Sequence, residues 1–266
     1  MPAKRDSNNL TEKEFLKQYT DAIYDKPSVT TDILVLSVNE SFSGLKVLLV
    51  KREEHPYLDC YALPGGFIMK DETAYQAAAR KLKEETGLED VYLDQIYTFT
   101  KPGRDPRTWV MSIAYLALVP VKIALSKAVW FDIRIEDSCI KLENSDEGVS
   151  ICYDITNTTF KNGKLSYENW VATPVTKDEL AFDHIEIIVE SFLKLRASFE
   201  HTDLAFNMVG DTFTLPDLQA LYELVLGKSL YKTNFRAMVT PKIEPTGSKI
   251  KSRTKNKLST EYRYRE

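Results

Sequence analysis

The sequence has few Cys and His residues and no long apolar run, which argues against a disulfide framework, a histidine metal site and a membrane span. Its 266 residues include three Cys and three His. Cys60, Cys139 and Cys152 are odd in number and lack metal-ligand spacing, so we expect reduced structural thiols. The three His are too scattered for a histidine metal site. There is no run of 18 apolar residues, and the N-terminus lacks the apolar region of a signal peptide. We therefore expect a cytoplasmic protein without membrane contact.

The charge of the chain is unevenly distributed. The total is −4, but residues 228–266 contain eleven Lys and Arg against three Glu, a net charge of +8, which leaves −12 for residues 1–227. A length of 266 residues suits two domains. A basic end on an acidic body suggests an anionic partner. Composition alone leaves the alternative of a disordered, solubilising tail.

A glycine-rich loop leads into a helix between Gly65 and Leu88. Asp71 is the predicted N-cap and Gly87 the left-handed residue that ends the helix. A buried stripe is expected at positions 74, 78 and 82, which are all apolar. The charged side chains on the other faces, free for chemistry, are Arg80, Glu84 and Glu85.

This stretch resembles the Nudix box. The positions that match its spacing are Gly66, Glu72, Arg80, Leu82, Glu84, Glu85, Gly87 and Leu88. The resemblance implies an α+β protein with a Nudix-fold α/β/α sandwich around a mixed sheet.

One position of the box differs. The family has Glu directly after the Arg, and this Glu and the last Glu of the box hold Mg²⁺. Here the first position is Lys81, whose ammonium supplies no oxygen ligand and neutralises Glu85. Mg²⁺ at Glu84 and Glu85 is therefore doubtful and no cofactor is obligatory, so we expect hydrolysis to be weak or absent. If the protein is active, Glu72 could replace the lost carboxylate. Outside this motif, Glu84 and Glu85 would be a solvated helix face.

Two segments flank the box on its N-terminal side. Thr11 and Glu14 have capping-box spacing, which predicts a helix from about 11 to 25 with an apolar stripe that includes Ile23. This helix would pack on the body or on a second subunit. Strands are predicted over 29–38 and 45–51. The second strand ends beside Arg52, which is either a phosphate contact, as the family implies, or a surface charge.

A stiff, basic loop follows the box. Strands are predicted over 91–100 and 109–119, and between them Pro102 and Pro106 fix a loop that carries Arg104 and Arg107. Two Arg side chains on such a loop suit bidentate recognition of phosphate. The alternative is a salt-bridged turn around Asp105. The ligand contacts expected by resemblance are Arg52, Gly65, Gly66, Arg80, Arg104 and Arg107.

The C-terminal segment has the pattern of a winged helix. A helix is predicted over 214–227, with Thr214 as its cap, and a second helix starts at Lys232. The side chains outward at the start of this second helix would meet base edges: Lys232, Thr233, Asn234 and Arg236. A basic hairpin follows, and its Lys249, Lys251 and Arg253 would face phosphates.

Together, these features resemble the NrtR family of Nudix-related transcriptional regulators. The residues that carry the resemblance are the loop at 104–107, Trp130-Phe131, the segment 180–184 and the winged helix. The implied domains are a Nudix-like domain over 1–200, with an added β segment at about 134–178, and a DNA-binding domain over 201–266. A turn is predicted at 158–163 within the added segment.

The family implies a ligand-responsive DNA-binding regulator. Its Nudix-like domain would sense ADP-ribose or a related nucleoside diphosphate derivative, with a link to NAD or sugar metabolism. A homodimer would bind a double-stranded, palindromic DNA operator. Two alternatives stay open: an active Mg²⁺-dependent hydrolase of the ADP-ribose pyrophosphatase type, and a nucleotide-binding scaffold with neither activity.

Overall fold

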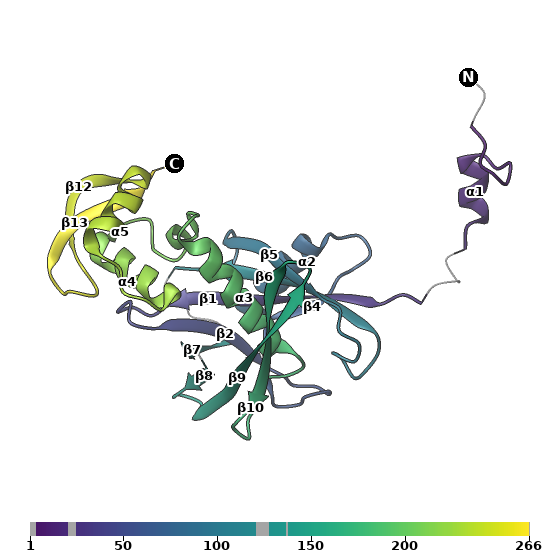
Figure 1. The fold of residues 1–266 in the computed structure, drawn as a ribbon, viewed down its shortest axis with the longest axis horizontal. Helices are drawn as coiled ribbons and strands as arrows, with labels where there is room; N and C mark the ends of the chain where they lie inside the picture. Colours follow the sequence, from purple (N-terminus) through teal and green to yellow (C-terminus); the bar gives the residue numbers. More distant parts are fainter. Residues whose placement is uncertain (1–3, 21–24, 121–127, 137, 266) are drawn as a thin grey trace.

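The computed structural model describes residues 4–20, 25–120, 128–136 and 138–265, and the backbone alone at 167–169. A large sheet with helices on its two faces is followed by a small unit with a sheet of its own (Figure 1). The elements of the first part are α1 (Glu12–Gln18), β1 (Ser28–Val38), β2 (Leu45–Lys51), β3 (Tyr61–Ala62), β4 (Gly65–Phe67), α2 (Ala74–Thr86), β5 (Tyr92–Phe99), β6 (Val110–Leu118), β7 (Ala128–Glu136), β8 (Cys139–Asn144), β9 (Val149–Asn162), β10 (Leu165–Pro174) and α3 (His184–Phe199).

The large sheet is mixed, as predicted. Its strand order is β10-β9-β8-β7-β2-β1-β6-β5, with β3 added to β2 and β4 added to β1. β1 pairs with β6 in parallel, whereas its pairings with β2 and β4 are antiparallel. The four strands expected before and after the glycine-rich stretch correspond to β1, β2, β5 and β6, with ends that differ by at most one residue.

The two faces of β1 build two separate cores. Ile33 and Val35 lie in one apolar cluster with Ala78 and Leu82 of α2. Leu34 and Leu36 face the other way, into a cluster that contains the buried side of α3. Successive strand residues point to opposite faces, and burying one such side chain contributes about 2 kcal/mol. The α/β/α sandwich is thereby confirmed.

The segment 134–178 extends the sheet on one side. β8, β9 and β10 are antiparallel neighbours. In the first half of β9, Ile151, Tyr153 and Ile155 are buried, whereas its second half is exposed. The turn region predicted at 158–163 is too long, because β9 runs on to Asn162 and the chain reverses only at Gly163, where φ is +63°. Cross-strand hydrogen bonds hold 158–162 in the ladder, which the polar sequence alone did not indicate.

The N-terminal helix is shorter than predicted. The capping box between Thr11 and Glu14 is present, but α1 ends at Gln18, since Tyr19 already has extended backbone angles. No residue of α1 is buried, and the helix projects away from the body (Figure 1). The packing on the body predicted for it is therefore wrong. Contact with a second subunit stays a prediction, and Ile23 lies outside the described residues.

The C-terminal unit has the predicted order of helices and hairpin. Its elements are a 3-10 helix (Leu204–Asn207), β11 (Phe213–Thr214), α4 (Leu215–Leu226), α5 (Lys232–Val239), a 3-10 helix (Thr240–Lys242), β12 (Ile243–Lys251) and β13 (Leu258–Tyr264). The Thr214 side chain caps α4, and Gly227 ends it with φ at +66°. Phe235 and Val239 are the buried residues of α5.

The helix α3 joins the two parts of the molecule. It ends at Phe199, and its last turns pack on α4. The Phe199 and Tyr222 rings lie 4.9 Å apart, and Arg196 Nε donates to the carbonyl oxygen of Val225 at 2.9 Å. This interface fixes the start of the winged helix relative to the sheet.

Candidate ligand cavity and DNA-binding surface

The helix α2 starts two residues later than a cap at Asp71 would place it. Thr73 is the N-cap, because the Gln76 N–H donates to Thr73 Oγ1 at 3.2 Å while the Thr73 N–H donates to Gln76 Oε1 at 2.8 Å. This reciprocal pair satisfies two backbone donors at once, which Asp71 could not do. Positions 78 and 82 are buried as predicted, but Ala74 is only partly buried. Gly87 ends the helix with φ at +77°.

A cavity of about 590 Å³ lies between β1, β2, β4, α2, the loop after β5 and the start of α3. Gly65 lets β1 and β4 come together, since a Cβ there would lie 2.2 Å from the Thr31 carbonyl oxygen. The described side chains that line the cavity include five basic ones, Lys51, Arg52, Lys81, Arg104 and Arg107, and five acidic ones, Asp32, Glu53, Glu54, Glu85 and Asp105.

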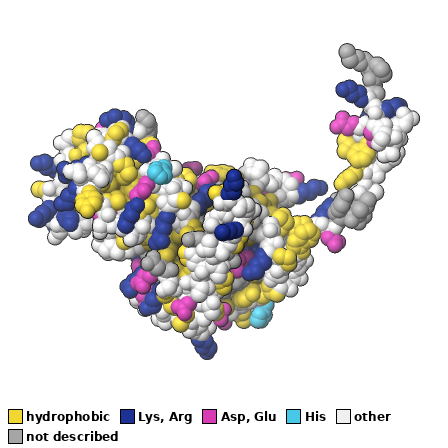
Figure 2. Space-filling view, viewed as in Figure 1, with side chains coloured by type: hydrophobic (Ala, Val, Ile, Leu, Met, Phe, Trp, Pro, Cys, Tyr) yellow, Lys and Arg dark blue, Asp and Glu magenta, His cyan; other side chains and the backbone are white. Residues whose placement is uncertain are grey.

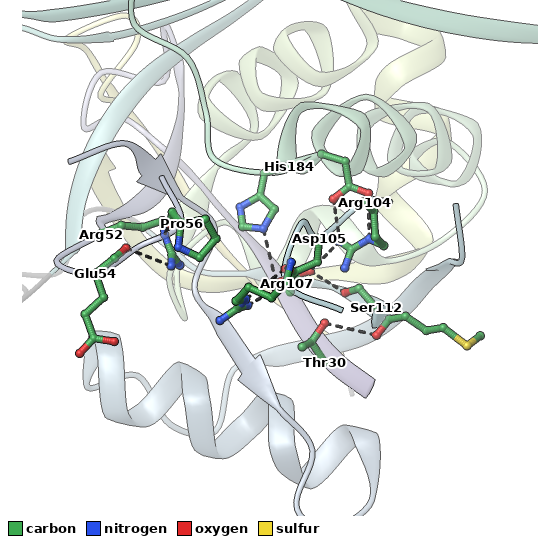
Figure 3. Close-up of polar contacts among 12 residues, drawn as sticks. Thr30, Arg52, Glu54, Pro56, Arg104, Asp105, Arg107, Ser112 and His184 are labelled. Atoms are coloured by element: carbon green, nitrogen blue, oxygen red, sulfur yellow. Dashed lines mark hydrogen bonds and ion pairs between the residues drawn. The ribbon is translucent and has the colours of Figure 1, made fainter. Parts of the chain in front are cut away.

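A buried charge cluster forms the floor of this cavity (Figure 3). Arg104 binds Asp183 through Nε and Nη2, at 2.8 and 2.6 Å, and Nη2 also reaches Asp32 Oδ2 at 3.3 Å. Its side chain is only 4% exposed. Two carboxylates of the protein thus engage the guanidinium that we predicted to contact phosphate. The contacts place Arg104 as the group that anchors this loop to β1 and α3.

His184 completes the floor. Its Nδ1 accepts from the Leu63 N–H at 2.9 Å, and Nε2 lies 3.6 Å from Asp32 Oδ1. Burial lowers the pKa of His184, so the imidazole is neutral at pH 7 and carries its proton on Nε2. The histidine therefore fixes β3 against α3 without adding a charge to the cavity.

Arg107 and Arg52 both lie against the ring of Phe182 at the mouth of the cavity. The Arg52 guanidinium carbon is 4.8 Å from the ring centre and that of Arg107 is 5.7 Å away. Arg107 is oriented by Asp105, which accepts from Nε at 3.0 Å and from Nη2 at 2.7 Å. Arg52 Nε donates to the Pro56 carbonyl oxygen at 2.8 Å. Both arginines of this pair line the cavity, and 43% of the Arg107 side chain is exposed.

Three of the predicted site residues pair with one another. Arg80 donates to Glu72 through Nε at 2.9 Å and Nη2 at 2.6 Å, and Nη1 lies 3.3 Å from Glu84 Oε1. Arg80 and Glu84, which were predicted to be free for chemistry, are therefore engaged in ion pairs. Hydrogen bonds from Arg80 lower the pKa of Glu72 to about 2. A carboxylate held in this bidentate pair is poorly placed to replace a missing metal ligand.

The position of Lys81 also bears on the metal. Lys81 Nζ lies 3.1 Å from Glu84 Oε2 and 3.9 Å from Glu85 Oε1, and Glu85 Oε2 accepts from the Gly65 N–H at 3.2 Å. The described part of the chain contains no group of three or more His, Cys, Asp and Glu that could hold a metal ion. The residues around Lys81 therefore do not fit the Mg²⁺ that the Nudix box implies, because an ammonium lies between the two carboxylates.

The second candidate site is the outer surface of the winged helix. At the start of α5 the side chains of Lys232, Thr233, Asn234 and Arg236 are all exposed. In the hairpin of β12 and β13, Lys249, Lys251 and Arg253 are exposed as well. Figure 2 shows Lys and Arg side chains gathered over this end of the molecule. A helix start beside a basic hairpin is the arrangement that reads a major groove and its flanking phosphates.

The wing is held by a residue that sequence reasoning missed. Asp217, in the first turn of α4, is 4% exposed. Its carboxylate accepts from Thr214 Oγ1, Ser252 Oγ and Thr254 Oγ1 and from two backbone N–H groups of the wing loop. Burial raises the pKa of Asp217, but these hydrogen bonds outweigh it and lower the pKa below its ordinary value. The sequence did carry a signal, an Asp three residues after the cap Thr214.

Comparison with known proteins places both sites in a family. Residues 27–134 match the NUDIX domain, and residues 205–264 match the NrtR DNA-binding winged helix domain. The chain is 30% identical to the ADPR responsive transcriptional repressor NtrR of Acinetobacter baylyi over 232 residues, which is 86% of this chain and 78% of that protein. None of the helices in the described ranges is long and apolar enough to cross a membrane.

Two solved structures share the whole architecture. A MutT/nudix family protein from Enterococcus faecalis superposes with a TM-score of 0.71 at 28% identity, over 96% of this chain and 98% of that one. Shewanella oneidensis NrtR, complexed with a 27mer DNA, gives a TM-score of 0.63 at 27% identity, over 89% and 93% of the two chains. The protein therefore belongs to the NrtR family, in which a Nudix domain precedes a DNA-binding winged helix.

Proposed function

We propose that the protein is a transcriptional regulator that binds duplex DNA through its winged helix and responds to ADP-ribose or a related nucleoside diphosphate derivative. The observation that carries the proposal is the presence, in one chain, of a cavity with Arg52 and Arg107 in its lining and an exposed helix–wing surface, joined by α3. The relative from Acinetobacter baylyi is described as responsive to ADPR. A role in NAD or sugar metabolism is an extension from the family.

The geometry of the cavity supports a diphosphate ligand. Arg107 is exposed at the mouth of the cavity and is held by Asp105. The N–H donors of Arg107 that Asp105 does not engage are available to a ligand in the cavity. An Arg fork of this kind is suited to phosphate oxygens. We propose Arg52 and Arg107 as phosphate contacts, with Gly65 and Gly66 in the adjacent wall. Arg80 and Arg104, which the carboxylates of Glu72 and Asp183 engage, position the helix and the loop.

The winged helix would act as half of a symmetric reader. We propose a homodimer in which two copies of α5 enter major grooves of a palindromic operator. Lys232, Thr233, Asn234 and Arg236 would face base edges, and Lys249, Lys251 and Arg253 would face phosphates. The ligand must then favour one arrangement of the two winged helices. A tenfold change in DNA affinity requires about 1.4 kcal/mol of coupling between the sites.

The test starts from an operator selected with the protein itself. Full-length protein would be used to enrich sequences from a pool of duplexes with a randomised core. The affinity for the enriched duplex would then be measured by fluorescence anisotropy while ADP-ribose is added. We expect the affinity to change at least tenfold, and AMP at the same concentration to have a smaller effect. Failure to enrich any sequence would contradict the proposal that the protein is a sequence-specific regulator.

We also infer that hydrolysis of ADP-ribose is weak or absent, because Lys81 lies between Glu84 and Glu85. Incubation with ADP-ribose and Mg²⁺ or Mn²⁺, followed by chromatography of AMP, tests this inference. Rapid release of AMP and ribose 5-phosphate would instead support the hydrolase alternative. In that case the winged helix would be an addition to an enzyme.

A further inference from the structure

The ammonium of Lys81 extends into the ligand cavity at the place where a divalent cation would act in a Nudix hydrolase. Lys81 lines the cavity together with Glu85, Gly65 and Gly66, and its side chain is 25% exposed. Its Nζ lies 3.1 Å from Glu84 Oε2. A Lys ammonium carries three donors and no acceptor, so it can bind several oxygen atoms at once.

Gly66 leaves room for the Lys81 side chain. A Cβ built on Gly66 would lie 2.4 Å from Lys81 Cε and 3.4 Å from Nζ. The methylene stem of Lys81 therefore lies in the space that a Cβ at position 66 would occupy, and a larger residue there would displace this flexible side chain. The ammonium lies 3.9 Å from Glu85 Oε1, and the other oxygen of Glu85 accepts from the Gly65 N–H.

The charge count of the cavity shows what this ammonium changes. With Lys81, the described lining is balanced, five basic side chains against five acidic ones, and His184 is neutral. With the Glu that the Nudix box normally has at this position, the same lining would carry a net charge of −2. A diphosphate, itself anionic, would then need a divalent cation to offset repulsion. With Lys81 in place, the diphosphate needs no divalent cation for this purpose.

We infer that Lys81 is a ligand-binding residue whose ammonium replaces the metal, so that the cavity binds the diphosphate of a nucleoside diphosphate derivative without a divalent cation. The contact of Lys81 with Glu84 is no obstacle, since half of the Glu84 side chain is exposed, and an exposed ion pair of this kind contributes little and can be exchanged for a phosphate. The inference rests on the proposed function, because it specifies how that same cavity recognises its ligand.

Calorimetric titration of the full chain with ADP-ribose tests the inference, in EDTA and in Mg²⁺. We expect wild type to bind with the same affinity, within about twofold, in both buffers. Lys81→Gln should bind at least tenfold more weakly in both, and Lys81→Arg should recover most of the loss. Lys81→Glu should bind weakly in EDTA and gain affinity when Mg²⁺ or Mn²⁺ is added.

Lys83→Gln is the matched control. Lys83 lies on the same helix, but its side chain is 61% exposed and paired with Glu89, outside the cavity lining. This variant should bind like wild type, and far-ultraviolet circular dichroism should show that all variants are folded. Affinity that falls more than tenfold in EDTA for wild type, or that is unchanged in Lys81→Gln, would overturn the inference.

Inorganic pyrophosphate separates this inference from the choice of ligand. If wild type binds pyrophosphate in EDTA and Lys81→Gln does not, the role of Lys81 stands even when ADP-ribose fails to bind, and only the proposed ligand is wrong. If ADP-ribose binds and regulates DNA binding, but equally well in Lys81→Gln, the proposed function stands and the role of Lys81 is wrong.

Discussion

Asp217 Oδ1 accepts a hydrogen bond from the backbone N–H of Thr254 at 2.9 Å and thereby fastens the loop of the wing to the first turn of α4. The two residues are 37 positions apart in the chain. Four further hydrogen bonds converge on the same carboxylate, from Thr214, Ser252, Arg253 and the Thr254 hydroxyl. The basic side chains of the wing are therefore carried by a loop whose base is rigid.

Replacement of Asp217 should loosen the wing. In Asp217→Asn, an amide nitrogen that cannot accept replaces one carboxylate oxygen, so either Thr214 and Arg253 or Ser252 and Thr254 lose their acceptor. We expect a decrease of about 3 kcal/mol in the free energy of unfolding, measured by urea denaturation, and faster hydrogen exchange of the Arg253 or the Thr254 amide. Asp211→Asn, at an exposed site, should change neither quantity. Unchanged exchange in Asp217→Asn would show that the other contacts suffice to hold the loop.

The same carboxylate predicts a pH dependence. The hydrogen bonds that outweigh burial lower the pKa of Asp217 in the folded state. The contribution of Asp217 to the free energy of unfolding is therefore complete above its pKa in the unfolded chain, about 4. It is lost as the pH falls through the lower pKa of the folded state. The difference in unfolding free energy between wild type and Asp217→Asn should be constant near neutral pH and decrease below about pH 4. A difference that grows on acidification would contradict the assignment.

Arg253 should contribute affinity without sequence preference. It is exposed in the wing loop, and its guanidinium carbon lies 5.6 Å from the centre of the Phe42 ring. A guanidinium above an aromatic ring keeps N–H donors at its edge that can bind a phosphate. Arg253→Ala should weaken binding to the enriched operator and to an unrelated duplex by similar factors. It should also make the slope of log affinity against log salt shallower by about 0.9. Lys164→Ala, an exposed cation at the tip of the β9–β10 hairpin, should leave both properties unchanged.

Asn234 should contribute to sequence preference rather than to the affinity for DNA of any sequence. Its side chain is exposed at the start of α5, and Asn pairs with two edge atoms of adenine in the major groove. Asn234→Ala should cost about 1–3 kcal/mol on the enriched operator and little on an unrelated duplex. Anisotropy titrations with both duplexes measure the ratio. A uniform loss on both would instead indicate a phosphate contact.

The elements with strong local signals could be predicted from the sequence. Thr214, Pro216 and Gly227 delimit α4, and the structure has them in those roles. Local signals did not identify the correct N-cap of α2, because two residues near its start are suited to that role. Asp71 and Thr73 can both cap a helix, and only the return contact from Gln76 selects Thr73.

The charge clusters could not be predicted in the same way. Arg104 meets Asp32 and Asp183, which are 72 and 79 positions away, and no periodicity links them. The loop at 104–107 was therefore predicted as two equivalent phosphate contacts. In the structure Arg104 is buried in ion pairs and Arg107 is exposed. Which of two neighbouring arginines faces a ligand depends on the fold.

The length of α3 sets the angle by which the winged helix is turned relative to the ligand cavity. The first residue of α3, His184, lies in the wall of the ligand cavity, and its last turn packs on α4. Its 16 residues span about 24 Å. Because each residue of an α-helix turns the chain by about 100°, a single insertion inside α3 would rotate the winged helix by more than a quarter turn around the sheet. In the proposed homodimer, the length of this one helix would therefore set the spacing between the two recognition helices.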